Sequence, residues 1–478
     1  MPQADNAADI RSVTGEKLAG RRAQVSWALF DFARSPYLSL VYIFVFPSYF
    51  ATTIVGDPVR GQEAWSSANT IVGFCVALFA PLLGAISDRT GRRKPWLIAI
   101  VAIMAPSCFV LWYAMPGGQG GLPVWVILGL IVVLASCFQF SEVFYNAILA
   151  SIASSQRIGG LSGLGIAVGN AGTLLALIVM LFGVALPASG ITIGGLLPAK
   201  PLFGLDPLLY EHDRIAGPAA GIWLIVFSLP LLLWTPDRPS TGIPARRAVR
   251  EGLGQLWLTV RRARQISNVG LYLLARMLYT DGLVAILAYT GIYAAGVFRW
   301  DLPAILVFAV ILTPFSISGG FIGGWLDNTL GSRRSILISV AATCIAMLAA
   351  VSISRDQIFF THFDVAAAGP LWSFPYFRTL PEVAYIVMTM VLAITITAAF
   401  CISRTMMARI APVSMMSQFF GLYALSGTAT GFLGHAAVSF FTRTFNSQRA
   451  GFASTIILLV AGLILMRWVK EERAAEIT

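Results

Sequence analysis

The amino-acid sequence predicts an all-α membrane protein whose twelve transmembrane helices form two pseudo-symmetric six-helix bundles. Of its 478 residues, 57% are hydrophobic and only 12% are charged, a balance with which a water-soluble fold cannot hide its apolar side chains. Apolar runs of about twenty residues, each long enough to cross a hydrocarbon core of roughly 30 Å as a helix, recur along the whole chain. A basic segment, residues 237–266, separates the first six runs from the last six.

The first half opens with a polar tail, residues 1–25, and continues as a predicted six-helix bundle, residues 26–236. Its first helix carries Asp31 and Arg34 and is then free of charge over residues 37–55. The continuous apolar runs favour helices over the alternating strands of a barrel, because a helix satisfies its own backbone hydrogen bonds in lipid. The predicted crossings of this half are 26–50, 68–87, 95–115, 122–149, 159–187 and 217–235.

Residues 237–266 are too polar and too rich in proline to span a membrane, so we interpret them as a linker. Five apolar residues in it follow helical spacing opposite an Arg-rich face, which predicts a short helix on the membrane surface; the alternative is an irregular loop. They are Val249, Leu253, Leu256, Trp257 and Val260. The second bundle, residues 267–468, ends in the run IILLVAGLILM, and residues 469–478 form a tail. Its predicted crossings are 268–297, 302–326, 335–353, 382–403, 415–442 and 450–468.

The basic residues are unequally divided between the two sides of the membrane. Of the 33 Lys and Arg residues, 23 fall on the side of the two tails, 8 fall on the opposite side, and Arg34 and Arg276 lie within helices. This asymmetry predicts that both termini are cytoplasmic, in a bacterial inner membrane. It also explains the net charge of +11 without a nucleic-acid partner. Residues 1–25 lack the apolar segment of a cleaved signal peptide.

Two internal matches relate the halves to each other. GAISDRTGRRK, residues 84–94, follows the second crossing, and GGWLDNTLGSRR, residues 323–334, follows the eighth. NAILASIA at 146–153 also matches RTMMARIA at 404–411. Repeats of this kind are typical of transporters built from two similar halves.

The loop of residues 84–94 has a physical logic. Gly84 permits close helix approach, Asp88 can accept hydrogen bonds from a neighbouring helix N-terminus or pair with Arg, and Gly91 allows a tight reversal. We interpret this loop and its copy as a latch that clamps helices together. The alternative, a topology anchor, explains the basic residues but not the aspartate and the glycines. The predicted latch residues are Gly84, Asp88, Arg89, Gly91, Arg92, Gly323, Asp327 and Arg333.

GAISDRTGRRK resembles the signature loop of the major facilitator superfamily, and its weaker copy occurs where that superfamily places one. The resemblance covers residues 24–468. It implies two six-helix bundles around a central cavity, which rock to expose a substrate to each side in turn. The signature loop is understood there as a latch that favours one orientation.

A narrower set of motifs is similar to the vacuole-effluxer-like branch, which is related to fungal autophagy-associated proteins thought to export amino acids from vacuoles. These motifs are WALFDFARSPY, FVFPSYFA, FYNAILASIA, LYTDG, SRTMMARIAP and FFGLYALSGTATGFLG. The chain departs from the branch at Arg34, where Asn is usual, at Pro36, where Ala is usual, and at Ala150-Ser151, where a Pro-Asp pair is usual. Two of these changes alter the charge or hydrogen bonding of the expected cavity wall.

Ionised side chains in the first and fourth crossings are candidates for a binding site. Arg34 lies roughly 12 Å inside the end of its helix, and Glu142 reaches a similar depth, so we expect Asp31, Arg34 and Glu142 to form a charged cluster beside the cavity that the resemblance implies. Tyr145 and Asn146 share the helical face of Glu142. A charge at the bilayer centre costs about 2.5–3.5 kcal/mol on insertion scales, so such residues generally serve a pathway.

The structural alternative for the first crossing is that Asp31 and Arg34 only neutralise each other near the interface, with Trp27 at the level of the lipid head groups. Both interpretations remain open from sequence alone.

The second half also carries charges within helices. Arg276 enters the seventh crossing to a depth like that of Arg34, and Asp281 lies near the bilayer middle. Their spacing of five residues suits no local pair, so we expect each to meet a different helix. Arg404, the repeat partner of Asn146, lies near the inner mouth. His435 is interpreted as a packing residue.

These residues predict a secondary active transporter for a small polar solute, either an amino acid or an organic acid. Arg34, Tyr145, Asn146, Arg276 and Arg404 are the predicted substrate-binding residues. The predicted proton-coupling residues are Asp31, Glu142 and Asp281, since a buried carboxylate can take up a proton on one side and release it on the other. Sodium is the alternative coupling ion, and we expect a monomer.

Two other functions remain open, namely a transporter or flippase of an amphipathic lipid or drug, and a membrane receptor or assembly factor that transports nothing. An enzyme is not expected, because the chain lacks H-E-x-x-H, Walker and G-x-S-x-G motifs and the G-x-G-D sequence of intramembrane aspartyl proteases. The five cysteines lack paired or metal-type spacing, so no metal and no cofactor are predicted.

Overall fold

The computed structural model describes residues 12, 16–116, 120–153, 158–191, 200–239, 241, 247, 267–410, 423, 426–427 and 430–471. The side chains of a few helical residues within these ranges, Asp88 and Arg89 among them, lie outside the description. The predicted surface helix of the linker, with Val249, Leu253, Leu256, Trp257 and Val260, lies outside it as well.

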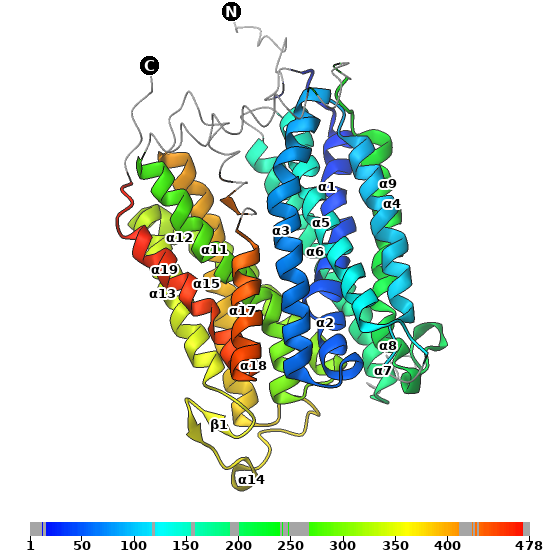
Figure 1. The fold of residues 1–478 in the computed structure, drawn as a ribbon, viewed down its shortest axis with the longest axis vertical. Coiled ribbons are helices and arrows are strands. Elements are labelled where there is room, and N and C mark those ends of the chain that lie inside the picture. The colour runs from blue at the N-terminus through cyan, green and yellow to red at the C-terminus, as the bar shows by residue number, and fades with distance from the viewer. Residues whose placement is uncertain are drawn as a thin grey trace, which may run out of the picture.

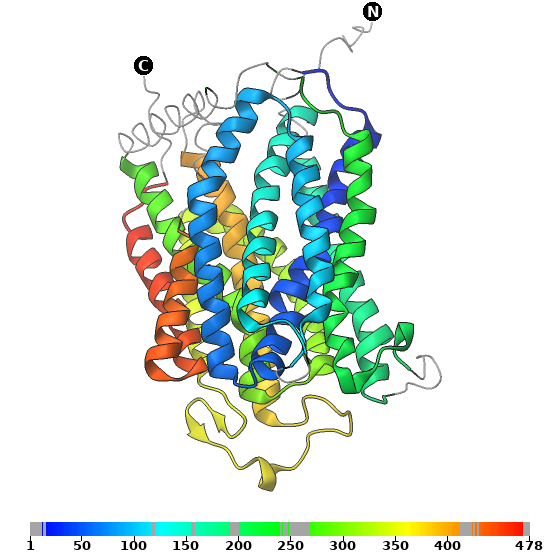
Figure 2. The same cartoon turned by 45° about the vertical axis from the view of Figure 1, so that its right-hand side comes forward.

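The structure is almost entirely helical, and its long helices run side by side in two groups (Figures 1 and 2). The first group contains α1 (Arg21–Pro36), η1 (Tyr37–Ile43), α2 (Val45–Tyr49), η2 (Phe50–Ile54), α3 (Pro58–Thr90), α4 (Lys94–Val110), η3 (Leu111–Tyr113), α5 (Val124–Ile152), α6 (Ile158–Met180), η4 (Leu181–Ala185), α7 (Leu186–Ala188), η5 (Leu202–Gly204), η6 (Pro207–Leu209), α8 (Glu211–Arg214) and α9 (Ala216–Trp234). The second contains α11 (Ser267–Tyr293), η7 (Ala294–Phe298), α12 (Leu302–Leu330), α13 (Ser332–Val351), β1 (Gln357–Ile358), β2 (Thr361–His362), α14 (Val365–Ala368), α15 (Leu380–Ile410), α17 (Phe432–Phe445), α18 (Gln448–Ala453) and α19 (Thr455–Met466).

Eleven helical segments of the described part are long and apolar enough to cross a membrane, and they coincide with eleven of the twelve predicted crossings. The remaining crossing, 415–442, falls largely on residues outside the description, and α17 covers its second half. The eleven described spans are therefore consistent with twelve crossings.

The first crossing departs from a regular helix in a way that the prediction did not include. Directly after Pro36 the chain widens into the π-helical segment η1, where the N–H of Phe44 bonds to the carbonyl of Ser39 at 3.0 Å. Proline removes one helical N–H, and the carbonyl of Phe32 that this N–H would have bonded accepts a hydrogen bond from Trp223 Nε1 of α9 at 2.9 Å instead.

The two bundles repeat the same local signals. Asp57 caps the start of α3 by accepting the N–H of Val59, and Asp301 caps α12 by accepting the N–H of Ala304. Both helices end at a glycine with positive φ, Gly91 at 84° and Gly331 at 81°. The packing repeats as well, since α3 and α4 pack on α5 as α12 and α13 pack on α15.

The molecule has two distinct ends, which we name for the arguments below. The basic end is where α1 begins and α3 and α12 end, and it carries Arg21, Arg92 and Arg333. The hairpin end is opposite, and β1, β2 and α14 lie beyond it (Figure 1).

The bundles meet along a polar seam near the hairpin end, between α3 and the helices α17 and α18. The buried side-chain amide of Gln62 donates to Thr442 Oγ1 at 2.9 Å and to the carbonyl of Gln448 at 3.1 Å. Ser67 Oγ lies 2.8 Å from Ser439 Oγ. All five residues lie in the hairpin-end half of the structure, so the seam holds that end closed.

Candidate functional site

Arg34 is the centre of a buried ionic cluster in the first bundle. Only 3% of the residue is exposed, although it sits in the middle of a membrane-spanning segment. Its guanidinium pairs with Asp31 one turn earlier and with Glu142 Oε1 of α5 at 2.8 Å. Nη1 also donates to Ser141 Oγ at 3.0 Å. The guanidinium of Arg34 thus links α1 to α5 through two carboxylates. The cluster is therefore more than the local neutralisation of Asp31 by Arg34 that the structural alternative requires.

Aromatic rings surround the guanidinium of Arg34. Its central carbon lies 5.3 Å from the ring centroid of Phe30, 5.1 Å from that of Phe138 and 4.9 Å from that of Tyr145. Ring faces attract cations, and attraction of this kind is stronger where water is excluded. The rings therefore help to hold the charge inside the bundle.

Trp27 and Tyr145 form a stacked pair beside this cluster. Their ring centroids are 4.2 Å apart with planes inclined by 2°, and Trp27 Nε1 donates to the carbonyl of Tyr145 at 2.9 Å. Trp27 is fully buried and contacts Tyr145, so it belongs to the packing around the cluster. A Cβ at Gly165 of α6 would lie 2.8 Å from the Tyr145 hydroxyl, which shows how closely α6 covers the pair.

Glu142 is the accessible member of the cluster. Its side chain is 38% exposed, against 20% for Asp31 and 4% for Arg34. The exposed Asn146 donates to Glu142 Oε2 at 3.2 Å. The carboxylate of Glu142 therefore joins the buried guanidinium to a polar, accessible surface.

The charges of the second bundle are arranged differently. Arg276 is buried and donates from Nη1 to the carbonyl of Tyr423 at 2.7 Å and to Ser426 Oγ at 2.6 Å. Its guanidinium also lies 3.5 Å from the ring centroid of Tyr423. The groups that contact the guanidinium of Arg276 here are thus neutral, and they belong to the eleventh crossing.

Asp281 lies on α11 and is 3% exposed. Its backbone carbonyl faces Gly434 of α17, Thr430 lies near its carboxylate, and the charge of Arg276 on the same helix acts on that carboxylate. No ion pair to Asp281 occurs among the described residues. Arg276 and Asp281 therefore both face the eleventh crossing, and the expectation that they meet different helices is wrong. Arg276 contacts Tyr423 and Ser426, whereas Asp281 lies near Thr430 and Gly434, which come later in the same crossing.

The remaining predicted residues of the second bundle lie apart from these two. Arg404 is exposed near the basic end of α15. His435 is buried, and its Nδ1 lies 2.7 Å from the hydroxyl of Tyr289, which gives it the partner expected of a packing residue.

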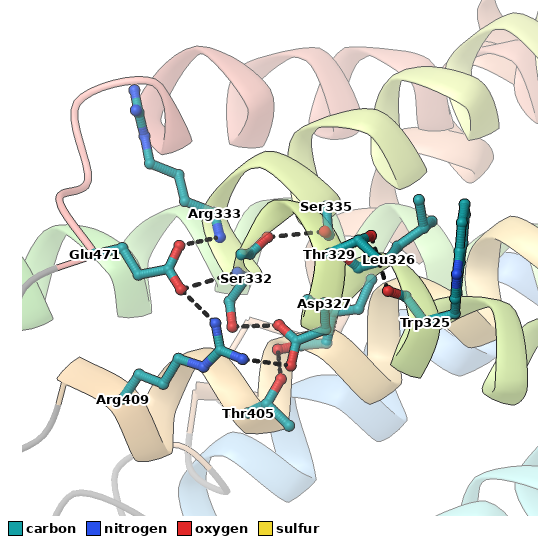
Figure 3. A network of polar contacts seen from close by, with 12 residues as sticks. Trp325, Leu326, Asp327, Thr329, Ser332, Arg333, Ser335, Thr405, Arg409 and Glu471 are labelled. Atoms are coloured by element: carbon teal, nitrogen blue, oxygen red, sulfur yellow. Dashed lines mark hydrogen bonds and ion pairs between the residues drawn. The ribbon is translucent and has the colours of Figure 1, made fainter.

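The predicted latch of the second bundle is a network at the basic end (Figure 3). Asp327 is buried at the end of α12, accepts a hydrogen bond from Ser332 Oγ at 2.5 Å and pairs with Arg409 Nη2 at 3.0 Å. Arg409 Nη1 pairs in turn with Glu471 Oε1 at 2.6 Å. Gly323 is pressed against Ala398 of α15, where a Cβ would lie 2.8 Å from the Ala398 Cα.

Glu471 also caps α13, because it accepts the backbone N–H groups of Ser332 and Arg333 at 2.9 and 3.0 Å. Partial burial raises the pKa of Glu471, but hydrogen bonds from these N–H groups and from Arg409 outweigh burial and leave the pKa below its ordinary value. The network therefore joins α12, α13, α15 and the segment after α19 within one bundle.

The first bundle has a matching cap. Asp237, which follows α9, accepts the N–H of Arg93 at 3.0 Å and that of Lys94 at 3.1 Å at the start of α4. Gly84 faces Val143 of α5, Gly91 makes the reversal and Arg92 is exposed. The side chains of Asp88 and Arg89 lie outside the description, so their predicted latch contacts stay predictions.

Sequence reasoning missed Asp237, Glu471 and Arg409. The signal for the two caps was present, because each acid follows a tryptophan by three residues, in WTPD at 234–237 and WVKE at 468–471. Among the described residues, no group of three or more His, Cys, Asp or Glu side chains is placed to hold a metal ion.

Comparisons with known proteins agree with this architecture. The sequence model of the family described as vacuole effluxer Atg22 like matches residues 66–477. The chain is 23% identical over 460 residues to YxiO of Bacillus subtilis, described as an uncharacterised MFS-type transporter, which covers 95% of this chain and 96% of that protein. It is 22% identical over 281 residues to autophagy-related protein 22 of Yarrowia lipolytica, over 54% of this chain but only 45% of that protein.

Solved structures share the fold. A D-xylose–proton symporter superposes with a TM-score of 0.64 at 11% identity, over 94% of this chain and 98% of the other. An inward-facing, unoccupied bacterial homologue of the human lysosomal transporter Spinster gives a TM-score of 0.59 at 14% identity, over 95% and 97%. The predicted fold class and the predicted family resemblance are thereby confirmed.

Proposed function

The chain belongs to the vacuole effluxer Atg22-like family and is a membrane transporter of the major facilitator type, and from this premise we propose a proton-coupled transporter of a small anionic or zwitterionic solute. The solute class is an amino acid or an organic acid, and it crosses by alternating access. The relatives and structural neighbours are transporters and not enzymes.

The observation that carries this proposal is the sharing of Arg34 between Asp31 and Glu142. A guanidinium presents a planar fork that suits a carboxylate, but here the fork is already occupied. When the accessible Glu142 takes up a proton, it loses its charge and its hold on the guanidinium weakens. Arg34 can then bind the carboxylate of a solute, so that proton uptake and solute uptake become linked.

Tyr145 and Asn146 complete this site in our proposal. The ring of Tyr145 lies between Arg34 and Trp27. Asn146 donates a hydrogen bond to Oε2 of Glu142, the carboxylate oxygen that does not pair with Arg34. Asn146 offers both a donor and an acceptor to a zwitterion. We assign Arg276 and Arg404 to the solute on the second bundle, because neither guanidinium pairs directly with a carboxylate of the described residues.

Asp281 is proposed as the second proton site. A carboxylate that is almost fully buried and forms no direct ion pair with the described residues is costly to keep ionised, so a proton or, alternatively, a sodium ion stabilises it. The closed seam at the hairpin end supports alternating access, because the seam must part when the other orientation forms. The distribution of basic residues supports a cytoplasmic basic end in a bacterial inner membrane, and we propose a monomer.

The test is transport by purified protein in vesicles with an imposed pH gradient, using radiolabelled amino acids and dicarboxylic acids. We expect an acidic exterior to stimulate uptake, and we expect Glu142→Gln and Asp281→Asn to lose that stimulation. Asp356→Asn, in an exposed loop of the hairpin end, is the matched control and should retain it. Unchanged stimulation in both site variants contradicts proton coupling, and a response to a sodium gradient instead identifies sodium as the coupling ion.

The other two functions are separate outcomes of the same experiment. Movement of fluorescent lipid or dye with no movement of polar solutes favours the transporter of an amphipathic compound. Binding of a polar solute, detected as a thermal shift, without movement of any solute favours the receptor or assembly factor.

A further inference from the structure

The loop between α13 and α15 carries an unusual β-hairpin at the hairpin end. Strands β1 and β2 pair antiparallel, with Ile358 opposite Thr361, so that Phe359 and Phe360 alone form the turn. Both have positive φ, 52° and 63°. Two-residue turns of this shape normally use Asn and Gly, because bulky side chains are disfavoured in the left-handed region. The hairpin thus has two bulky phenylalanines at the positions where the backbone tolerates a bulky side chain least.

Both phenylalanine rings point away from the protein core, since Phe359 is 57% and Phe360 is 60% exposed. In water this arrangement combines a disfavoured backbone with two exposed aromatic rings. The arrangement is favourable only if the rings leave water for an apolar or amphipathic surface.

The hairpin is fixed at the level at which the crossing helices end. The N–H of Phe360 donates to the carbonyl of Ser352, directly after α13, at 3.0 Å. Arg449 of α18 donates to Gln357 Oε1 of β1 at 3.1 Å. The tip therefore lies beside the ends of two membrane helices.

The side of α13 that leads to the hairpin faces lipid. Ile345 is 71% and Leu348 is 55% exposed on this membrane-spanning helix. Ser352, whose carbonyl accepts the N–H of Phe360, is buried and follows Leu348 by four residues, about one helical turn further along. The hairpin is therefore attached about one turn beyond the last exposed apolar residue of this membrane-spanning helix.

The charged residues of the loop are gathered elsewhere. Arg355, Asp356, His362 and Asp364 line a polar cavity of about 380 Å³. Phe359 and Phe360 are not among the lining residues of this cavity. The loop thus has a polar part and an uncharged aromatic tip, as expected of a segment that lies at a membrane surface.

We propose that Phe359 and Phe360 insert into the boundary between lipid head groups and acyl chains on the hairpin side and anchor this loop to the bilayer. The lipid surface is preferred over a partner protein because the hairpin is attached directly at the end of α13, about one turn beyond the exposed apolar residues Ile345 and Leu348 of this membrane-spanning helix. The inference goes beyond transport and does not depend on the identity of the solute.

An environment-sensitive fluorophore tests the position of the tip. The fluorophore is attached to Phe360→Cys in a full-length version without the five native cysteines, in lipid nanodiscs, and Ala367→Cys on the exposed α14 of the same loop is the matched control. We expect several-fold weaker quenching by aqueous iodide at position 360 than at position 367, together with quenching by lipids that carry a nitroxide near the head group. Equal iodide quenching at both positions overturns the proposal. Protection from iodide without quenching by lipid also overturns it, because the tip is then covered by protein.

A second variant separates the anchor from the integrity of the hairpin. Phe359→Asn with Phe360→Gly supplies the residues that the turn prefers, so the hairpin keeps its shape while it loses both rings. We expect the wild-type protein to gain more thermal stability than this variant on transfer from detergent to nanodiscs, with the variant at least as stable in detergent. An equal gain in both proteins overturns the proposal.

Discussion

At the residue scale, the central feature of the molecule is one guanidinium held by two carboxylates. Arg34 pairs with Asp31 on its own helix and with Glu142 on α5. The three groups carry one negative charge in excess when both acids are ionised, so a single proton brings the cluster to neutrality. Asp281 forms no direct ion pair with the described residues, although the charge of Arg276 on the same helix acts on it. The two bundles thus differ, since the first has a directly paired cluster and the second has an acid and a cation that are not in contact.

Removal of the Arg34 cation should destabilise the protein strongly. Arg34→Ala leaves two neighbouring carboxylates without their partner, and breaking a buried ion pair in this way costs about 3–5 kcal/mol. Thermal unfolding in detergent measures the loss, and Arg60→Ala, which removes an exposed pair with Asp57, is the matched control. Adding Asp31→Asn and Glu142→Gln to Arg34→Ala should recover much of the loss. Equal unfolding temperatures for Arg34→Ala and Arg60→Ala contradict the stabilising role of the ion pairs that Arg34 forms with Asp31 and Glu142.

The same substitution should have opposite effects on two buried aspartates. Asp281→Asn removes a buried acid that forms no direct ion pair with the described residues, so we expect an unfolding temperature that is unchanged or raised, together with lost proton coupling. Asp327→Asn removes an acid that is paired with Arg409 and bonded to Ser332, and should destabilise by about 1–3 kcal/mol. A destabilisation of similar size in both variants indicates that Asp281 has a structural partner.

At the element scale, each bundle ties the start of its third helix to the segment that follows its sixth. Asp237 caps α4, and Glu471 caps α13. Helix N-termini expose N–H groups that have no partner within the helix, and a carboxylate there satisfies these donors and complements the helix dipole. The caps therefore close each bundle on itself at the basic end, which allows it to move as one body.

The Glu471 cap should be sensitive to acid. Because its folded pKa lies below the ordinary value of 4.5, the cap contributes stability that is fully present above that value and is lost as pH falls through the lowered pKa. The difference in unfolding temperature between the wild-type protein and Glu471→Gln should therefore be constant at neutral pH and shrink below pH 4.5. Asp356→Asn, in an exposed loop, should show no such trend. A difference that grows as the pH falls contradicts the assignment.

Much of the element scale was predictable from sequence, because hydrophobic runs, caps and breakers are local signals. The crossing at 302–326 was predicted from its apolar run and its observed helix, α12, extends to Leu330, where Gly331 ends it. The meeting of Arg34 with Glu142 was expected from their similar depth in the first and fourth crossings together with the superfamily resemblance, which places these two helices beside the cavity. The partners of Arg276 did not, since a backbone carbonyl and a serine hydroxyl leave no charge pattern in the sequence. The π-helical turns after Pro36 were also missed, because hydropathy does not distinguish helix types.

At the scale of the whole molecule, the arrangement of contacts indicates which end is closed. The polar seam between α3 and α17 lies near the hairpin end. The two helices also pack closely at Gly73, where a Cβ would lie 2.5 Å from the backbone N of Phe432. The capping networks at the basic end stay within their own bundles. Two bundles that are each closed internally and joined at one end suit a rocking motion about the site between them.

Locking the seam should therefore stop transport without unfolding the protein. Ser67 and Ser439 have hydroxyl oxygens 2.8 Å apart on opposite bundles, so cysteines at these positions bring two sulfur atoms within reach of a disulfide. In a version without the native cysteines, we expect oxidation of Ser67→Cys with Ser439→Cys to abolish uptake and reduction to restore it, because the hairpin end can no longer open. Thr343→Cys with Thr395→Cys is the matched control, since these hydroxyls are 2.9 Å apart within the second bundle and their link leaves rocking free. Uptake that continues through the oxidised seam variant, with the cross-link verified by mass spectrometry, means that the solute crosses without separating α3 from α17, and the rocking model then fails for this protein.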